Sequence, residues 1–173
     1  MTFSIRATIR ALLVPECRIN CPRRLWKQIL TQLGRRGEGR HESGAFLLGR
    51  GTGSSLEVKE AIYYDELDSN AYSTGVCVLF GDAFAKLWAI CRERGLTVVA
   101  DAHTHPGAAR QSGSDRANPM VARAGHIAII VPRYAEAPVV ISDLGIYEYQ
   151  GEHRWKNRSG KNANRFLYTG YWS

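Results

Sequence analysis

The chain is poor in the features that mark several common protein classes. It has four cysteines (Cys17, Cys21, Cys77 and Cys91) and no Cys-x-x-Cys pair, so the sequence does not support a structural zinc knuckle. The apolar run near the start, Ala-Leu-Leu-Val, is too short for a secretory signal, and no stretch approaches the length needed to span a bilayer. We therefore expect a cytoplasmic protein with free thiols and no membrane partner.

The length of 173 residues suits one domain with its own core. Hydrophobic residues make up 45% and charged residues 23% of the chain, which is ordinary for a folded protein and argues against general disorder. We expect a single domain over residues 1–173, with a basic strand–helix segment at its start and a basic, aromatic tail at residues 151–173.

The net charge of +7 is unevenly distributed. Residues 1–40 carry +7, residues 41–150 carry −4 and residues 151–173 carry +4. A basic surplus points to nucleic acid or an acidic partner, and the tail interleaves aromatic and basic residues in a way that suits base stacking. The same tail equally suits a C-terminal strand or a docking segment, so nucleic-acid binding stays an open alternative.

Periodicity predicts a mixed α+β fold with a curved sheet, two main helices and a short helix after a loop at residues 106–119. The first helix would begin after an N-cap at Asn20, carry Pro22 in its first turn and end at Gly34, and the second would run from a cap at Asp82 to Gly95. Strands are predicted at residues 2–13, 42–50, 54–66, 76–80, 96–103, 126–132 and 138–143, and a turn at Gly151.

The chemical signal lies in Asp-Ala-His-Thr-His-Pro, residues 101–106. Since residues i and i+2 of a strand point to the same side, His103 and His105 would project together as two imidazole metal ligands. Asp115 is a candidate third ligand, and three protein ligands plus water are typical of a catalytic rather than a structural zinc. His-x-His alone is weak evidence, because paired histidines also occur by chance.

With Glu42 and Ser112 added, the sequence resembles the JAMM (JAB1/MPN+) zinc metalloprotease signature. That signature has a glutamate, then His-x-His-Pro, then Ser-x-x-Asp; here these are HESGAFLLG, HTHP and SGSD, within residues 40–120. Six residues separate His105 from Ser112, where the family usually has seven, and Ser43 follows Glu42 where many members have glycine. Barrel enzymes with His-x-His carry it near their start, and zinc deaminases need Pro-Cys-x-x-Cys, so neither class fits.

The resemblance implies a JAB-type, cytidine-deaminase-like α-β sandwich and assigns a role to each residue. His103, His105 and Asp115 would bind Zn²⁺, Glu42 would be the general base and Ser112 would stabilise the oxyanion. Ser112 is preferred to Ser114 because it keeps the three-residue step to Asp115, and Ser114 has a competing role as a helix N-cap. Asp101 is a candidate for orienting an imidazole and stays outside the core site.

The resemblance also implies an isopeptidase or peptidase that cuts after the C-terminal tail of ubiquitin or a ubiquitin-like protein. Such small members often accompany ubiquitin-like conjugation enzymes, including those of antiphage defence, which would be the neighbouring partners. Two alternatives remain open: a catalytically inactive JAB-fold interaction module and a nucleic-acid-binding protein of the same fold. The complete Glu, His-x-His and Asp set argues against an inactive module.

Overall fold

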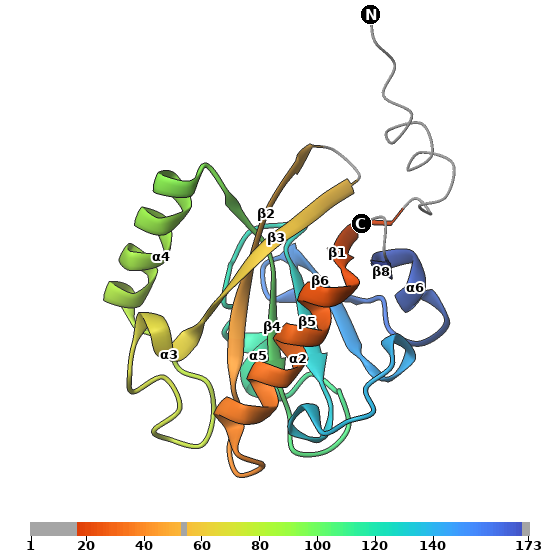
Figure 1. The fold of residues 1–173 in the computed structure, drawn as a ribbon, viewed down its shortest axis with the longest axis horizontal. Coiled ribbons are helices and arrows are strands. Elements are labelled where there is room, and N and C mark those ends of the chain that lie inside the picture. Colours follow the sequence, from red (N-terminus) through yellow and green to blue (C-terminus); the bar gives the residue numbers. More distant parts are fainter. Residues whose placement is uncertain (1–16, 53–54, 171–173) are drawn as a thin grey trace, which may run out of the picture.

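One curled, mixed sheet of eight strands organises the computed structural model, which describes residues 17–52 and 55–170 (Figure 1). The strand order is β7-β6-β5-β4-β2-β3-β1-β8. The strands are β1 (Ile19–Pro22), β2 (Gly44–Thr52), β3 (Ser55–Tyr63), β4 (Thr97–Thr104), β5 (Ile127–Val131), β6 (Gly145–Gly151), β7 (Arg154–Asn157) and β8 (Leu167–Gly170). No helix among the described residues has the length and apolar character needed to cross a membrane.

Helices cover both faces of this sheet (Figure 1). The helix α2 (Arg23–Gly37) packs on one face and α4 (Gly81–Arg94) on the other. Short segments complete the chain: α3 (Tyr64–Leu67), α5 (Gly113–Ala117), α6 (Ala163–Phe166) and the 3₁₀ turns η1 (Arg133–Ala135), η2 (Ile141–Asp143) and η3 (Gly160–Asn162). The mixed sheet, the two main helices and the short helix after the histidine motif are as the sequence predicted.

The central strand β2 is buried on both faces, which explains its continuous apolar run. Ala45 and Leu47 belong to the core under α2, whereas Phe46 and Leu48 belong to the core under α4. This alternation follows the period of two along a strand. It matters for the site because Phe46 is paired with Asp101 of β4 and therefore marks the face on which the functional side chains lie.

The predicted ends of α2 are wrong. Asn20 lies in β1, where its side-chain amide donates to Ser55 Oγ at 2.7 Å, and Pro22 occupies the N-cap position rather than the first turn. The helix continues beyond Gly34 to Gly37, and Glu38 ends it in the left-handed conformation at φ 51°. A Cβ at Gly34 would make only ordinary contacts, the nearest at 3.5 Å from the Tyr134 carbonyl oxygen, so the helix continues through this position without needing a glycine there.

In α4, Phe80 holds the N-cap position and the predicted cap, Asp82, lies in the first turn. Gly95 ends this helix as expected, in the left-handed conformation at φ 60°. Leu87 and Cys91 are buried in the core under α4, as their spacing indicated, but Trp88 is 40% exposed.

Two predicted strands do not form. Residues 76–80 pair with no strand: the Val78 amide donates to the Ala71 carbonyl, while Val76 and Phe80 are exposed. Residues 138–143 lie outside the sheet because both edges of β5 are already taken by β4 and β6. The turn at Gly151 is confirmed, with φ 86°. The strand predicted at residues 2–13 lies outside the described residues.

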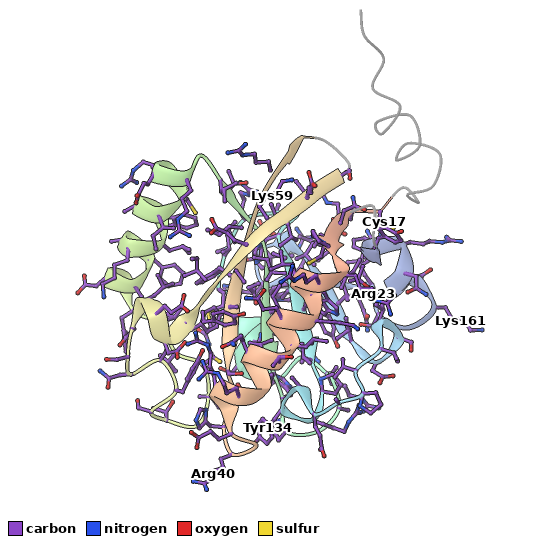
Figure 2. The ribbon with its side chains drawn as sticks, in the orientation of Figure 1. Cys17, Arg23, Arg40, Lys59, Tyr134 and Lys161 are labelled. Atoms are coloured by element: carbon purple, nitrogen blue, oxygen red, sulfur yellow. The ribbon has the colours of Figure 1, made fainter. Side chains whose placement is uncertain are left out.

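The described parts of the basic ends are built into the fold. The C-terminal segment supplies β7, α6 and β8, and β8 pairs in parallel with β1. Arg40, after α2, and Lys161, in η3, extend from separate edges of the molecule (Figure 2). The four cysteines, all in the described part of the chain, are not joined by disulfides, and Cys17, Cys21 and Cys91 are buried, as predicted for thiols.

Candidate metal centre

The site is built on the end of β4, the strand between β2 and β5. Ala100 and Ala102 pack in the core under α2, so Asp101 and His103 point to the opposite face. At the end of the strand, the Thr104 amide donates to the Ser43 carbonyl, and just beyond it the His105 amide donates to the Val131 carbonyl, both at 2.9 Å. His105 is therefore held between the neighbouring chain segments although β4 has ended.

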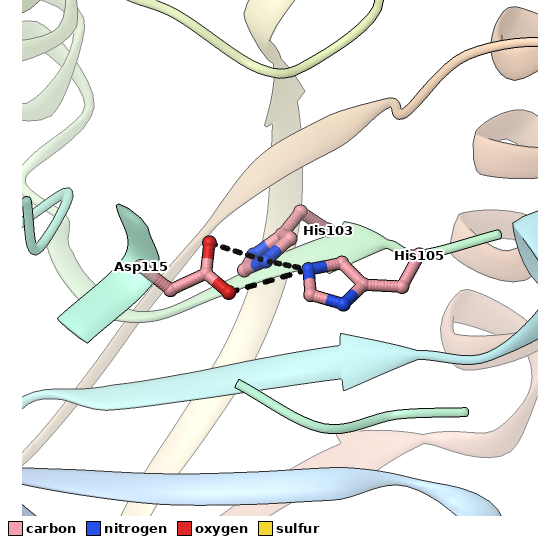
Figure 3. Close-up of side chains that lie close together, drawn as sticks. All are labelled: His103, His105 and Asp115. Carbon is pink, nitrogen blue, oxygen red and sulfur yellow. Dashed lines mark hydrogen bonds and ion pairs between the residues drawn. The ribbon is translucent and has the colours of Figure 1, made fainter. Parts of the chain in front are cut away.

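His103, His105 and Asp115 converge on one point (Figure 3). The two Nε2 atoms are 3.2 Å apart, and the Asp115 carboxylate oxygens lie 3.5 Å from His103 Nε2 and 3.3 Å from His105 Nε2. Three ligand atoms at the usual zinc distances in a tetrahedron are separated by about 3.3 Å. The spacing of these side chains therefore fits a metal ion held by two imidazoles and one carboxylate.

Asp101 lies behind the first ligand and links it to a second histidine. Asp101 Oδ1 is 2.6 Å from His126 Nε2, and its Oδ2 is 3.6 Å from His103 Nδ1. A carboxylate only accepts hydrogen bonds, so His126 Nε2, at 2.6 Å, carries hydrogen. His103 Nδ1 also faces this carboxylate, so once His103 is neutral a hydrogen on Nδ1 leaves the lone pair of Nε2 for a metal. His126 and Asp101 are each 2% exposed. This is the carboxylate–histidine arrangement that orients metal ligands.

We expect Asp101→Asn to weaken metal affinity by about 10- to 100-fold. The amide carries no charge to stabilise a metal-bound imidazole, and one of its two ends must face a ring N–H. Competition with a zinc chelator measures the affinity, and thermal unfolding of the metal-free protein measures the accompanying stability loss. The exposed Asp82→Asn, in the first turn of α4, is the control; an equal effect there would show that Asp101 does not orient His103.

The third ligand is fixed by the cap of α5. Ser112 is the N-cap: its Oγ accepts from the Asp115 amide at 3.1 Å, and Asp115 Oδ2 accepts from the Ser112 amide at 2.6 Å. The N-cap role assigned to Ser114 is therefore wrong, since Ser114 lies inside α5. Because the Ser112 hydroxyl acts here as an acceptor, its own hydrogen remains free to donate to another group.

Glu42 lies on the other side of the histidines, in the segment before β2. Its Oε1 is 3.7 Å from His105 Nε2, its side chain is 15% exposed, and its amide donates to the Gly75 carbonyl at 3.0 Å. Burial raises the pKa of Glu42, against the opposing effect of the two histidines. A carboxyl group with a raised pKa, close to but outside the metal-ligand cluster, has the properties of a general base.

Glu42, His103, Ser112 and Asp115 line one cavity of about 190 Å³. Its other walls include residues 76–78, Gln111, residues 118–120 and Trp155. Trp155 and Cys77 could not be assigned to the site from the sequence, because their positions beside it depend on tertiary packing.

Two carboxylates of α3 are paired with α2. Arg36 of α2 pairs with Asp65 and lies 2.7 Å from Glu66 Oε1. These two carboxylates help to attach α3 to α2.

The metal-free site holds a proton. Burial alone would lower the pKa of His103, but Asp101 and Asp115 on its two sides outweigh it and raise the pKa to about 10. Burial alone would raise the pKa of Asp115, but His103 and His105 hold it well below its usual range. At neutral pH, His103 is therefore a cation between two carboxylates, and a metal ion would take the place of its proton.

Metal binding is accordingly expected to release about one proton per ion near pH 7, and the apparent affinity to rise about tenfold per pH unit from pH 6 to 8. The sign follows from His103, which is protonated below its raised pKa and must lose that proton to become a ligand. Calorimetry in buffers of different ionisation enthalpy counts the protons. Release of no proton from His103, and an affinity independent of pH, would contradict this assignment.

Comparisons of sequence and of structure identify known proteins to which this chain is similar in part. No known family model matches the sequence. The chain is 31% identical over 84 residues to a probable metalloprotease, y4jG, of Sinorhizobium fredii; the match covers 48% of this chain and 52% of that protein. The chain thus spans about half the length of the curated relative that it matches.

Two solved structures share the architecture. A protein from Desulfitobacterium hafniense superposes with a TM-score of 0.60 at 17% identity, over 87% of this chain and 93% of that one. A protein from Salinibacter ruber superposes with a TM-score of 0.50 at 24% identity, over 77% and 86%. At these identities the likeness concerns the fold alone. The chain is thus a mixed α+β protein with a His-His-Asp cluster suited to a metal ion, and it is similar in part to a probable metalloprotease.

Proposed function

We propose that the protein is a zinc-dependent peptidase or isopeptidase of the JAMM type. It hydrolyses the bond after the C-terminus of ubiquitin or a ubiquitin-like protein, and its fold is the JAB α-β sandwich. The observation that carries the proposal is the convergence of two imidazoles and two carboxylates, Asp115 and Glu42, from three separate segments. His103 and both carboxylates line one cavity. The y4jG relative adds support for metal-dependent proteolysis.

Each residue has a task that its surroundings permit. A zinc ion supplies a Lewis acid and a water ligand whose pKa is about 7. Glu42, 3.7 Å from His105 Nε2, accepts a proton from the attacking water and returns it to the leaving amine. The Ser112 hydroxyl donates to the carbonyl oxygen as negative charge develops there. Asp101 keeps His103 in the tautomer that a metal requires.

The substrate class and the partners are part of the proposal. A ubiquitin-like tail is extended and ends in small residues, so it can enter a cavity whose walls include residues 76–78, a segment that pairs with no strand. Conjugation enzymes, including those of antiphage defence, are the proposed neighbours, since a deconjugating enzyme acts on their products.

A panel of ubiquitin-like proteins fused through their C-termini to a reporter tests this function. We expect cleavage of at least one fusion after the ubiquitin-like C-terminus, its loss with a chelator and its recovery with zinc. Absence of cleavage across the panel, with zinc bound, would reject the ubiquitin-like substrate class. Cleavage that a chelator leaves unchanged would reject the metal mechanism.

Ser112→Ala is expected to have two separable effects. Loss of the helix cap should lower the free energy of unfolding by about 1 kcal/mol, and loss of the oxyanion donor should lower kcat by about 10²- to 10³-fold. Ser114→Ala, which changes a serine lining the same cavity but outside the cap, is the matched control. Chemical denaturation and kcat on a cleaved fusion measure the two effects; a larger kcat loss in Ser114→Ala would transfer the oxyanion role to Ser114.

A further inference from the structure

A second cavity, of about 490 Å³, lies beside the metal centre. Gln111 and Trp155 line both cavities, so the two are adjacent. Within α5, Asp115 lines the metal cavity, while the next residue, Arg116, lines the second one. The lining of the second cavity contains Arg110 and Arg116 and no carboxylate.

Hydrogen bonds fix the walls of this second cavity. Tyr147 of β6 accepts from the Gln111 amide at 3.2 Å and donates to the Ala109 carbonyl at 3.4 Å through the same hydroxyl. Trp155 of β7 donates its indole N–H to the Arg116 carbonyl at 3.2 Å. The loop before α5 also passes so close to Gly145 that a Cβ there would lie 2.0 Å from the Ala109 oxygen. The cavity is therefore preformed.

The two arginines of this cavity have no acidic partner within residues 17–52 and 55–170, the described part of the chain. Nearby Arg158 shows the contrast, since it lies 2.6 Å from Glu148 Oε2. Two unpaired guanidinium groups around one hollow produce a positive potential and offer paired donors, which suit a carboxylate.

Gln111 gives the second, independent indication of a ligand. Its side chain is 91% buried (9% exposed), and its Nε2 has no hydrogen-bond partner among the described residues. A buried donor without an acceptor is costly, by about 1–3 kcal/mol, and is rare in folded proteins. The Nε2 atom is itself enclosed, so a ligand with an acceptor oxygen in the second cavity would satisfy this amide after a rotation of the Gln111 side chain.

We infer that the second cavity is a subsite for a carboxylate of the peptide substrate, held by Arg110, Arg116 and the Gln111 amide. This inference rests on the proposed peptidase function and deepens it, because it adds a preference for an acidic residue near the bond that is cut. The carboxylate is that of an Asp or Glu side chain or that of a free C-terminus. Trp155 forms the wall between this subsite and the metal centre.

Peptide binding tests the subsite without requiring cleavage. The probes are acetyl-Gly-Glu-Gly-amide against its Gln counterpart, and acetyl-Gly-Gly-Gly with a free C-terminus against its amide. NMR titration of the protein as purified follows the Gln111 side-chain amide and the Trp155 indole N–H. We expect the carboxylate form of at least one pair to bind about tenfold or more tightly than its neutral partner, as hydrogen bonds to a charged group require. The pair that responds identifies the source of the carboxylate.

Substituted variants test whether a preference for carboxylates comes from this cavity or from the overall positive charge of the protein. Arg110→Gln/Arg116→Gln and, independently, Gln111→Met should each remove the carboxylate preference; Gln111→Met sacrifices no side-chain hydrogen bond of the described structure. Arg123→Gln, which removes one positive charge at an exposed position outside the lining of the cavity, should retain the preference. Equal binding of charged and neutral probes by the unmodified protein, or an equal loss in Arg123→Gln, would overturn the inference.

The binding and cleavage experiments can reject the subsite and the peptidase function independently of each other. Selective carboxylate binding without cleavage of any fusion would keep the subsite and reject the peptidase function. Cleavage of a fusion without carboxylate selectivity would keep the function and reject the subsite.

Discussion

Glu42→Gln should abolish cleavage while leaving the metal in place. The amide keeps the size of the side chain but cannot accept a proton from water, so we expect kcat to fall by about 10²- to 10⁴-fold. Glu42 Oε1 lies 3.7 Å from His105 Nε2 and outside the cluster of three ligands, so zinc content should stay unchanged. Cleavage of a ubiquitin-like fusion and elemental analysis of the same preparation provide the two readouts.

The exposed Glu136→Gln, in the turn after η1, is the control for the loss of one carboxylate. Retained cleavage by Glu42→Gln would mean that another group is the base. Loss of zinc together with activity would mean that Glu42 is itself a ligand. Only an inactive protein with its metal intact agrees with the assignment.

His105→Ala and Asp115→Asn should each remove the metal and, with it, all cleavage. Each change takes away or weakens one of three ligands, so the effect should exceed the 10- to 100-fold expected for an orienting partner, giving at least about a hundredfold loss of zinc affinity. Asp115→Asn should also lower stability, because Asp115 completes the capping box with Ser112.

Asp143→Asn, which changes an exposed carboxylate of η2, is the matched control. Chelator competition measures zinc affinity, and circular dichroism checks that each variant is folded. A folded Asp115→Asn or His105→Ala protein that binds zinc as tightly as the parent would remove that residue from the ligand set.

The arrangement of the site residues was predicted from the sequence more accurately than the structure of the segments around them. His103 and His105 could be assigned to one face because the period of a strand is local, and β4 forms where its apolar run predicts it. The short helix after the metal motif was predicted to follow a loop at residues 106–119, but α5 forms within that segment, with Ser112 as its N-cap. The three-residue step from Ser112 to Asp115, which favoured Ser112 for the site, is also the spacing of a capping box.

The errors arise where tertiary contacts override local signals. Gly34 was expected to end a helix, but a Cβ there would make only ordinary contacts and the helix continues. Residues 76–80 have the apolar character of a strand, yet they pair with no strand, and residues 76–78 line the metal cavity. Asp101 links His103 and His126, which are 23 positions apart, and that connection depends on the pairing of β4 with β5.

The basic surplus that first pointed to nucleic acid has an alternative explanation in the structure. Arg36, Arg154 and Arg158 form ion pairs within the fold, and Arg40 and Lys161 extend from different edges. The unpaired Arg110 and Arg116, by contrast, lie in the middle of the chain beside the metal centre. The middle of the chain, residues 41–150, has a net charge of −4, yet it contains two cations that line a cavity beside the metal centre.

Elemental analysis of the protein, purified without added metal or chelator, tests the central claim most directly. Two imidazoles and a carboxylate at tetrahedral spacing predict about one zinc per chain in the parent protein and close to none in His105→Ala. A parent protein that contains no metal, and binds none when zinc is supplied, would contradict the account.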